Sequence, residues 1–292
     1  MSAAQLIGIA ALLAVVAGPA ALALAGWLRA RYTLPAQGAG VRRRWRWKLT
    51  AMSALLYVLA FNLTFFIQEL FLVLPKALTP GLRPTLFHNN HTWHGHHPLA
   101  SLFQGTGALA TFAAARLFLF WMAYSGMFMA LPQVAIGAVS TQSDLGMAMS
   151  YLGLALPAKV VLALLALAAI PLIAARLARL LLAQAGDTPL IATAGGRHLF
   201  VFEAATLPAL VALPVIFLFR IPREWTEVVM VPVAVTVVGL LWVQAGAWRA
   251  RQGSVDAPGP ASGPESIAWP LAAVLALLLL FQLLLRPGIR FY

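Results

Sequence analysis

The stretch Leu49–Leu74, with the sequence LTAMSALLYVLAFNLTFFIQELFLVL, decides the fold class of this chain. It is long enough for an α-helix to cross the roughly 30 Å hydrocarbon core of a bilayer, and Glu69 is its one charged residue. The rest of the chain has the same character, because 62% of its 292 residues are hydrophobic, 10% are charged and the mean hydropathy is +0.87. This composition leaves too little polar surface for a soluble protein, so it predicts an integral membrane protein.

A window of about 19 residues identifies seven candidate membrane spans along the chain. They are Gln5–Leu28, Leu49–Leu74, Gly105–Leu131, Tyr151–Ile173, Leu199–Phe219, Trp225–Trp248 and Ile267–Leu285. We therefore expect an all-α bundle of about seven transmembrane helices, folded as a single domain over residues 1–292. Residues 252–266 are rich in Gly, Pro and Ser and are predicted to form a flexible loop.

The charged residues and the absence of cysteine narrow the function class. A net charge of +12 is typical of nucleic-acid-binding proteins when a chain is soluble, but the arginines here lie in loops and at span ends. There they set the membrane orientation and contact anionic headgroups, so we expect membrane lipid and no nucleic acid as a partner. The chain has no cysteine, which excludes disulfides, iron–sulfur clusters and thiolate zinc sites.

Positive charge also predicts the orientation of the first two spans. Seven cations lie in the connection between them: Arg29, Arg31, Arg42, Arg43, Arg44, Arg46 and Lys48. The positive-inside rule places this connection in the cytoplasm, so the N-terminus and the connection 75–101 are predicted to lie outside. The excess of arginine over lysine is typical of GC-rich bacteria, and we therefore predict a bacterial inner membrane protein.

The second half of the chain fits the same rule less well. With seven alternating spans, Arg176, Arg179 and Arg197 lie outside. The cation-free connection 132–150 then lies inside. An eighth or re-entrant crossing near that connection, or within the apolar stretch 99–139, would remove the conflict, so the sequence leaves seven and eight crossings open.

Five of the six histidines lie within the segment 87–98, FHNNHTWHGHHP. They are His88, His91, His94, His96 and His97. Imidazole is the most common metal ligand, and a helical turn would bring the first three, spaced every third residue, near one face. Gly95 provides a hinge that returns one of the last two to the same ion. The segment therefore predicts an outward-facing transition-metal site for zinc or copper; a solvated interfacial loop and a pH-sensing or hydrogen-bonded cluster are the alternatives.

Two acidic residues lie inside predicted spans at similar depths. Glu69 lies five residues before the outer end of the second span, and Glu203 lies four residues into the fifth. At about 1.5 Å per residue, both are roughly 6–8 Å below the outer boundary. We therefore predict that both carboxylates complete the metal site beneath the histidines. In the alternative, Glu69 pairs with Lys76 and Glu203 pairs with Arg197.

Arg116 lies near the centre of the third predicted span, where an unpaired arginine costs about 2.5–3.5 kcal/mol. We predict that it is the charge partner of Glu69 or Glu203. If the span begins later in the chain, Arg116 lies instead at the membrane interface.

These features lead to three functional hypotheses. The first is transport of zinc or copper, or delivery of the metal to another membrane complex. The second is a metal-dependent enzyme acting on a lipid-linked substrate, with Glu69 or Glu203 as general base. The third is a non-catalytic subunit whose histidine loop docks a membrane protein partner. No metalloprotease helix, nucleophile elbow, phosphate-binding loop or set of separated histidine boxes occurs in the sequence, so motifs do not separate the three.

Overall fold

The structure, a computed structural model, describes residues 2–32, 45–106, 116–185, 191, 193–250 and 266–292. The predicted flexible loop 252–266 lies outside these residues, apart from Ser266. The all-α fold class is confirmed, because seven helical segments are long and apolar enough to cross a membrane.

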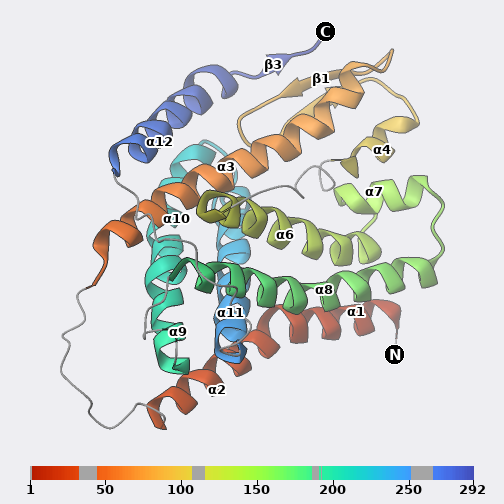
Figure 1. Cartoon of the computed structure of the whole chain (residues 1–292). Helices are drawn as coiled ribbons and strands as arrows, with labels where there is room; N and C mark the ends of the chain where they lie inside the picture. Colours follow the sequence, from red (N-terminus) through yellow and green to blue (C-terminus); the bar gives the residue numbers. More distant parts are fainter. Residues whose placement is uncertain (1, 33–44, 107–115, 186–190, 192, 251–265) are drawn as a thin grey trace.

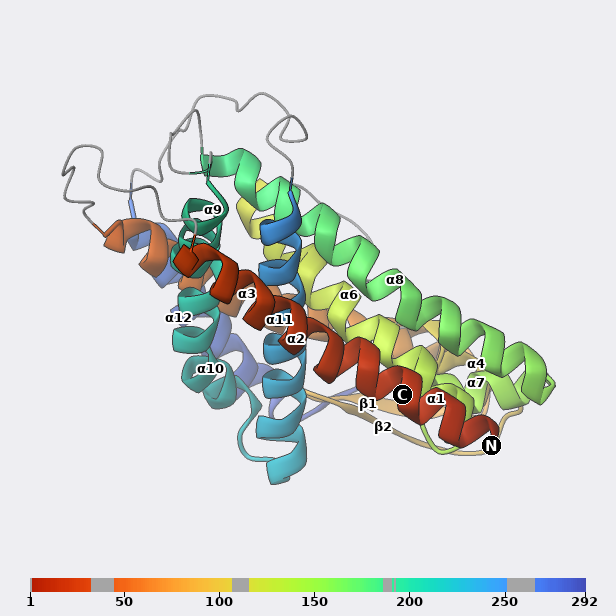
Figure 2. The ribbon, with the colours of Figure 1, turned by 90° about the horizontal axis from the view of Figure 1, so that it is seen from below.

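The seven spans are built from the following elements. They are α1 (Ala3–Leu12) with η1 (Leu13–Ala17) and α2 (Gly18–Tyr32), α3 (Trp47–Ala77), α6 (Arg116–Val139), α8 (Leu156–Leu182) with η2 (Ala183–Ala185), α9 (Ala194–Val201) with η4 (Phe202–Thr206) and α10 (Leu207–Arg220), η5 (Thr226–Met230) with α11 (Val231–Arg249), and α12 (Ala268–Leu280) with η7 (Phe281–Leu285). In Figure 1, α1, α6 and α8 lie side by side and are crossed by α10 and α11. Figure 2 shows α8 following α6 along its length.

The fourth span begins later than the sequence predicts, at Leu156, and the described part of the third span begins at Leu117. Tyr151 belongs to a separate short helix, α7 (Asp144–Tyr151), and Gly153 follows it with a φ of 61°. A positive φ cannot continue a helix, and Pro157 then occupies the first turn of α8. Hydropathy alone does not detect this break because the residues around it remain apolar.

The bundle has two ends, which we name after residues on them. The arginine end contains Arg46 and the start of α3, and the histidine end contains the last turns of α3 and residues 78–104. At the arginine end, the Thr50 hydroxyl donates to the Glu203 carbonyl at 3.0 Å. At the histidine end, the Asn89 amide donates to the Arg220 carbonyl at 2.9 Å. The segment from α9 to α10 therefore runs from the arginine end to the histidine end.

Simple alternation of seven spans, one of the two arrangements that the sequence leaves open, does not hold at the third span. The indole of Trp121, near the start of α6, donates to Ser53 near the start of α3 at 3.0 Å. A Cβ atom added to Gly137, near the end of α6, would lie 2.9 Å from the Gly146 nitrogen of α7. A short helix, α4 (Leu99–Phe103), packs on α7 at the histidine end. Helices α3 and α6 thus point the same way, and the connection 132–150 lies at the histidine end.

The direction of α6 sets the direction of every later span. The structure describes the chain to Thr106 at the histidine end and again from Arg116 at the arginine end; residues 107–115 lie outside the described ranges. Because α6 ends at the histidine end, every later span is inverted relative to the prediction. The cations Arg176, Arg179 and Arg197 therefore lie at the arginine end, with Arg46.

The histidine segment forms a β-hairpin rather than a helical turn. Strand β1 (Arg83–Leu86) pairs antiparallel with β2 (His91–His94), and the short strand β3 (Ile289–Arg290) pairs with the other edge of β1. The Phe87 amide donates to the Asn90 carbonyl at 2.8 Å and closes the turn. Figure 1 shows β1 and β3 beside the end of α3. The C-terminal segment thus holds the hairpin against the bundle.

The core is centred on α3, the most buried of the spans. Its Tyr57 lies in a cluster of aromatic rings with Phe61, Trp121 and Tyr124. The Tyr57 hydroxyl is 2.8 Å from the hydroxyl of Thr236 on α11, and Tyr124 donates to the Thr236 carbonyl at 2.6 Å. These hydrogen bonds satisfy polar groups that have no access to water, which is a condition for placing them inside a membrane bundle.

Candidate functional site

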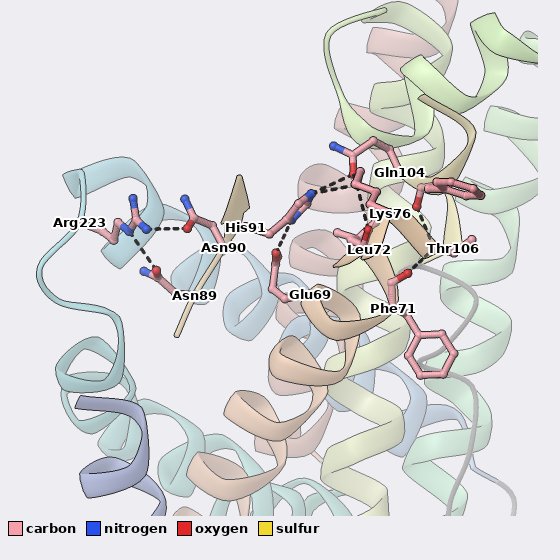
Figure 3. A network of polar contacts seen from close by, with 11 residues as sticks. Glu69, Phe71, Leu72, Lys76, Asn89, Asn90, His91, Gln104, Thr106 and Arg223 are labelled. Atoms are coloured by element: carbon pink, nitrogen blue, oxygen red, sulfur yellow. Dashed lines mark hydrogen bonds and ion pairs between the residues drawn. The ribbon is translucent and has the colours of Figure 1, made fainter. Parts of the chain in front are cut away.

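The last turns of α3 and strand β2 form a buried cluster of charged and polar side chains, shown in Figure 3. Glu69 and Lys76 are seven residues apart on α3, which places them two turns apart on one face of the helix. The residue between them in space is His91 of β2, whose Nδ1 is 2.8 Å from Glu69 Oε2. Glu69 is only 6% exposed, so its carboxylate depends on this partner for most of its hydrogen bonding.

Lys76 is fully buried and completes the other side of the cluster. Its ammonium group donates to the Leu72 carbonyl at 2.9 Å, to Gln104 Oε1 at 2.7 Å and to His91 Nε2 at 3.2 Å. All three N–H bonds therefore have acceptors, and the ammonium also lies 4.6 Å from the centre of the Trp93 ring.

These contacts fix the tautomer of a neutral His91. Because an ammonium group can only donate, Nε2 must accept from Lys76, and the single ring proton must lie on Nδ1. The Nδ1–H group then donates to Glu69. The cluster is thus a chain of carboxylate, imidazole and ammonium, in which the ring links two groups of opposite charge.

Asp144 of α7 adds a second acid to this environment. Ser143 caps α7 by accepting a hydrogen bond from the Gly146 amide at 3.2 Å, and Asp144 follows it directly. Burial raises the pKa of Asp144, the negative charge of Glu69 raises it further, and His91 and Lys76 oppose the shift. Two acids and two bases therefore share one electrostatic site at the histidine end.

The turn of the hairpin is fixed to the end of α10 by a second set of contacts (Figure 3). Arg223 donates from Nε to Asn89 Oδ1 at 3.1 Å and from its terminal nitrogen to Asn90 Oδ1 at 2.5 Å. The Asn89 amide donates in turn to the Arg220 carbonyl. Since Asn90 directly precedes His91, these bonds hold the strand that carries the imidazole.

The five histidines of the segment separate into different environments. The His91 side chain is 7% exposed in the cluster, and His88 is 3% exposed with no hydrogen bond to either ring nitrogen. His94 and His96 are exposed, and His97 Nδ1 accepts from the Leu99 amide at 3.2 Å. The expected helical turn is wrong because residues three apart in a strand point to opposite faces, so His91 and His94 diverge.

No group of three or more His, Asp or Glu side chains in the described residues is arranged to hold a metal ion. Glu69 and His91 supply two adjacent groups that metals favour, but the Lys76 ammonium already occupies the lone pair of His91 Nε2. The zinc or copper site therefore stays a prediction.

The environment of His88 is electrostatically positive. Burial, with smaller contributions from the charges of Arg223, Arg220 and Arg286, lowers the pKa of His88 to about 4. The Arg220 carbonyl opposes the shift but lies outside hydrogen-bonding geometry with either ring nitrogen. The ring is therefore neutral at physiological pH.

Glu203 does not belong to this site, and the predicted cluster with Glu69 is wrong. Its carboxylate is buried at the arginine end, 3.5 Å from the Arg46 Nε, and accepts a hydrogen bond from the Arg46 main-chain nitrogen. Glu69 follows Arg46 by 23 residues on α3, which corresponds to roughly 35 Å at ~1.5 Å per residue. The sequence places Glu69 and Glu203 at the same depth only because simple alternation gives the fifth span the direction opposite to the one in the structure. Arg116 opens α6, and its side chain lies outside the described part of the chain.

Three members of the cluster were absent from the predicted site: Lys76, Gln104 and Asp144. The sequence suggests Lys76 only as a direct partner of Glu69, whereas the structure joins the two through His91. Its spacing of seven residues from Glu69 is the signal that a shared helix face would have given. Gln104 and Asp144 carry no local signal, because the folding of α4 and α7 against α3 brings them to the site.

Comparison of the chain with protein-family models, with curated proteins and with solved structures finds no match. The chemistry of the site must therefore be argued from its own geometry.

Proposed function

We propose that this multi-pass membrane protein is a proton-coupled transporter in which His91 is the proton-exchanging group. The observation that carries the proposal is the hydrogen-bonded chain Glu69–His91–Lys76, buried at one end of the most buried span. Imidazole is the side chain whose ordinary pKa lies closest to neutral pH, and buried ionisable groups in membrane bundles commonly mark proton or ion pathways.

The geometry supports coupling between proton uptake and movement. A proton that binds His91 must bind at Nε2, since Nδ1 already carries one; Gln104 Oε1, 3.1 Å away, can accept this N–H, and the Lys76 ammonium loses His91 as an acceptor. The imidazolium and the ammonium then repel each other, and Glu69 and Asp144 are the acids near enough to neutralise them. Because Lys76 is on α3 and His91 is on the hairpin, protonation loosens the contact between these two elements.

A stripe of polar side chains on α3 supports a route through the bundle. Thr50, Ser53, Tyr57, Thr64 and Gln68 follow one another at helical spacing and are all buried. The stripe begins at the arginine end, where Thr50 and Ser53 donate to main-chain carbonyls of η4. Polar side chains within membrane spans face the bundle interior, and a continuous row of them is typical of a pathway lined by protein.

Phe61 interrupts this stripe between Tyr57 and Thr64 and is fully buried. It lies against Tyr57 with ring centroids 5.9 Å apart. A proton or a substrate can cross this apolar layer only when the helices rearrange. The aromatic layer therefore has the position expected of a gate between two half-pathways.

Charge supports an orientation for the proposed transporter. The described residues at the arginine end include a group of cations in or beside the spans. They are Arg29, Arg46, Lys48, Arg176, Arg179, Arg197 and Arg249. Because Arg176, Arg179 and Arg197 lie at the same end as Arg46, we propose that this end is cytoplasmic and that the N-terminus and the histidine end face outward in a bacterial inner membrane.

Transport of zinc or copper is distinguishable from this proposal through Lys76. A metal ion at His91 Nε2 competes with the ammonium for one lone pair, so Lys76→Met increases metal affinity if a metal is the cargo. Under the proton proposal the same variant impairs proton exchange and leaves metal content at background. Elemental analysis and zinc titration of the two proteins separate these outcomes.

The proposal is tested by proton uptake into proteoliposomes that contain a pH-sensitive dye, driven by a potassium diffusion potential with and without external zinc. We expect uptake in wild type, and losses of about 100-fold in Glu69→Gln and His91→Asn, typical of removing a proton-transfer group. His94→Asn is the matched control because His94 lies on the exposed face of the same strand. Uptake no faster than in protein-free liposomes, or an equal loss in His94→Asn, contradicts the proposal.

A further inference from the structure

A second site at the histidine end lies outside the proposed proton pathway. A cleft of about 370 Å³ lies between the end of α10 and the last turns of α12 and η7. It is lined by Leu218, Ile221, Pro222, Leu278, Gln282 and Arg286. Gln282 donates to the carbonyls of Leu218 and Ile221 at 2.8 and 3.0 Å, which fixes the two walls relative to each other. The cleft is apolar along its length and carries a cation at one end.

Three arginines concentrate positive charge around that end. They are Arg220, Arg223 and Arg286, and none of them has a carboxylate within 4 Å in the described residues. Arg220 donates through Nε to the Glu227 carbonyl at 2.8 Å and lies over Phe65, and Arg223 is held by the two asparagines of the hairpin turn. Arginines positioned by neutral groups keep their full charge available for an external anion.

His88 is the second indication of a ligand at this site. Its ring is 3% exposed and neither nitrogen has a hydrogen bond, although a neutral imidazole carries one N–H donor. The three arginines act electrostatically on this ring and lower its pKa, so all four side chains share one environment. Gly288 keeps β3 and Arg286 close, because a Cβ atom there would lie 2.6 Å from Phe87, the residue before His88.

We propose that the phosphate headgroup of an anionic phospholipid binds to Arg220, Arg223 and Arg286, with one of its acyl chains in the adjacent cleft. Charge complementarity selects the headgroup, since no carboxylate in the described residues lies within 4 Å of these arginines; Glu69 and Glu227 act on Arg220 only from farther away. Position selects a lipid over a soluble anion, because the apolar cleft continues from the cations along membrane-spanning helices. Basic pockets between transmembrane helices are sites where such headgroups bind.

The proposal is tested by titrating purified full-length protein, in neutral phosphatidylcholine nanodiscs, with a fluorescent phosphatidylglycerol. We expect Arg286→Gln and Arg223→Gln each to weaken binding about five-fold, the effect of one cation beside an anionic headgroup. Arg290→Gln is the matched control, because Arg290 is exposed on β3 four residues from Arg286. It should change the affinity less than two-fold, a factor below the effect of one such cation.

Two further measurements separate the acyl chain from the headgroup. Leu278→Trp fills the cleft without changing charge and should also weaken lipid binding, while inorganic phosphate at millimolar concentration should not displace the lipid. Complete displacement by inorganic phosphate assigns the site to a soluble anion and overturns the proposal. Equal affinities of Arg286→Gln, Leu278→Trp and Arg290→Gln for phosphatidylglycerol also overturn it, provided that all three variants elute as wild type does in gel filtration.

Discussion

Glu69 and Glu203 are two buried carboxylates in membrane-spanning segments, and the structure gives them opposite surroundings. Glu203 contacts the guanidinium and the main-chain nitrogen of Arg46, at the N-terminus of α3. An arginine keeps its charge at all physiological pH values, and a helix N-terminus favours an anion. Glu69 contacts the imidazole of His91, which also contacts the ammonium group of Lys76. Burial alone therefore does not identify a functional acid; the partner does.

The same contrast holds for the two ends of the bundle. At the arginine end, hydrogen bonds from Thr50 and Ser53 to η4 join helices directly and involve no titratable partner. At the histidine end, an added hairpin supplies the imidazole, and α7 supplies Asp144. We infer that the arginine end anchors the bundle and that the histidine end carries the chemistry.

The parallel arrangement of α3 and α6 places the hairpin and the connection 132–150 on the same side of the membrane. This gives the largest expected effect, an all-or-none result in cysteine labelling. The native chain has no cysteine, so single substitutions are clean probes. Thr92→Cys and Gln142→Cys, both exposed at the histidine end, should react with an impermeant thiol reagent in intact cells. Thr193→Cys, at the arginine end, should react only after permeabilisation. Labelling of Thr92→Cys with protection of Gln142→Cys would restore simple alternation of the spans and contradict the parallel arrangement of α3 and α6.

Loss of the Lys76 ammonium is expected to destabilise the protein by about 3 kcal/mol. Lys76→Met removes the donor shared by Leu72, Gln104 and His91 and leaves buried acceptors unsatisfied, at about 1–3 kcal/mol each. The measurement is thermal unfolding in detergent at pH 7.5. Lys159→Met is the control, since Lys159 has one long contact, 3.4 Å to Ser150 in an exposed setting. Similar unfolding temperatures for both variants would show that the cluster does not hold the hairpin.

Neutral replacements of the two glutamates should produce a crossed pattern. Glu203→Gln weakens the contact with Arg46 and should cost about 2 kcal/mol, reduced because Arg46 is partly exposed, with little change in proton uptake per folded molecule. Glu69→Gln keeps a hydrogen-bonding group beside His91 and should lower uptake far more than stability. Unfolding temperature and uptake are measured on the same preparations. Parallel losses of both quantities in both variants would remove the distinction between a structural and a functional carboxylate.

The smallest expected effect is a dependence of stability on pH caused by His88. Its pKa is about 4 in the folded protein, below the ordinary value of 6.5, so the unfolded chain binds the extra proton first. Stability should be constant above pH 6.5 and fall as the pH drops from 6.5 to 4, by at most about 1.4 kcal/mol per pH unit. His88→Asn should flatten this dependence, whereas His96→Asn, at an exposed position, should not. Identical pH profiles for wild type and His88→Asn would assign the acid sensitivity to other groups.

The sequence predicts the seven spans because hydropathy reports the length of an apolar segment directly. It does not report the direction in which a span crosses the membrane, and the predicted position of Glu203 is therefore at the wrong end of the bundle. One reversed span, α6, was sufficient for this error because every later span inherits its direction. The surplus of Arg176, Arg179 and Arg197 on the predicted outer side was the signal of that reversal.

The candidate site was predicted in part. Glu69 and His91 were both named, and they are in contact. The spacing of His88, His91 and His94 was interpreted with helical periodicity, whereas strands of four residues are too short for their own periodicity to be recognised. The position of Lys76 at His91 Nε2 depends on how the hairpin packs against α3, which no local pattern encodes.

The state of the His91 ring tests the central claim most directly. ¹⁵N NMR of histidine-labelled protein in bilayers, with His91→Asn for assignment, reports which ring nitrogen carries the proton. At high pH we expect a neutral ring that is protonated at Nδ1, with Nε2 accepting from Lys76. A second proton should bind at Nε2 over the pH range in which proton transport changes. A neutral ring protonated at Nε2, or a ring that does not titrate between about pH 5 and pH 8, would contradict the proposal that His91 exchanges the transported proton.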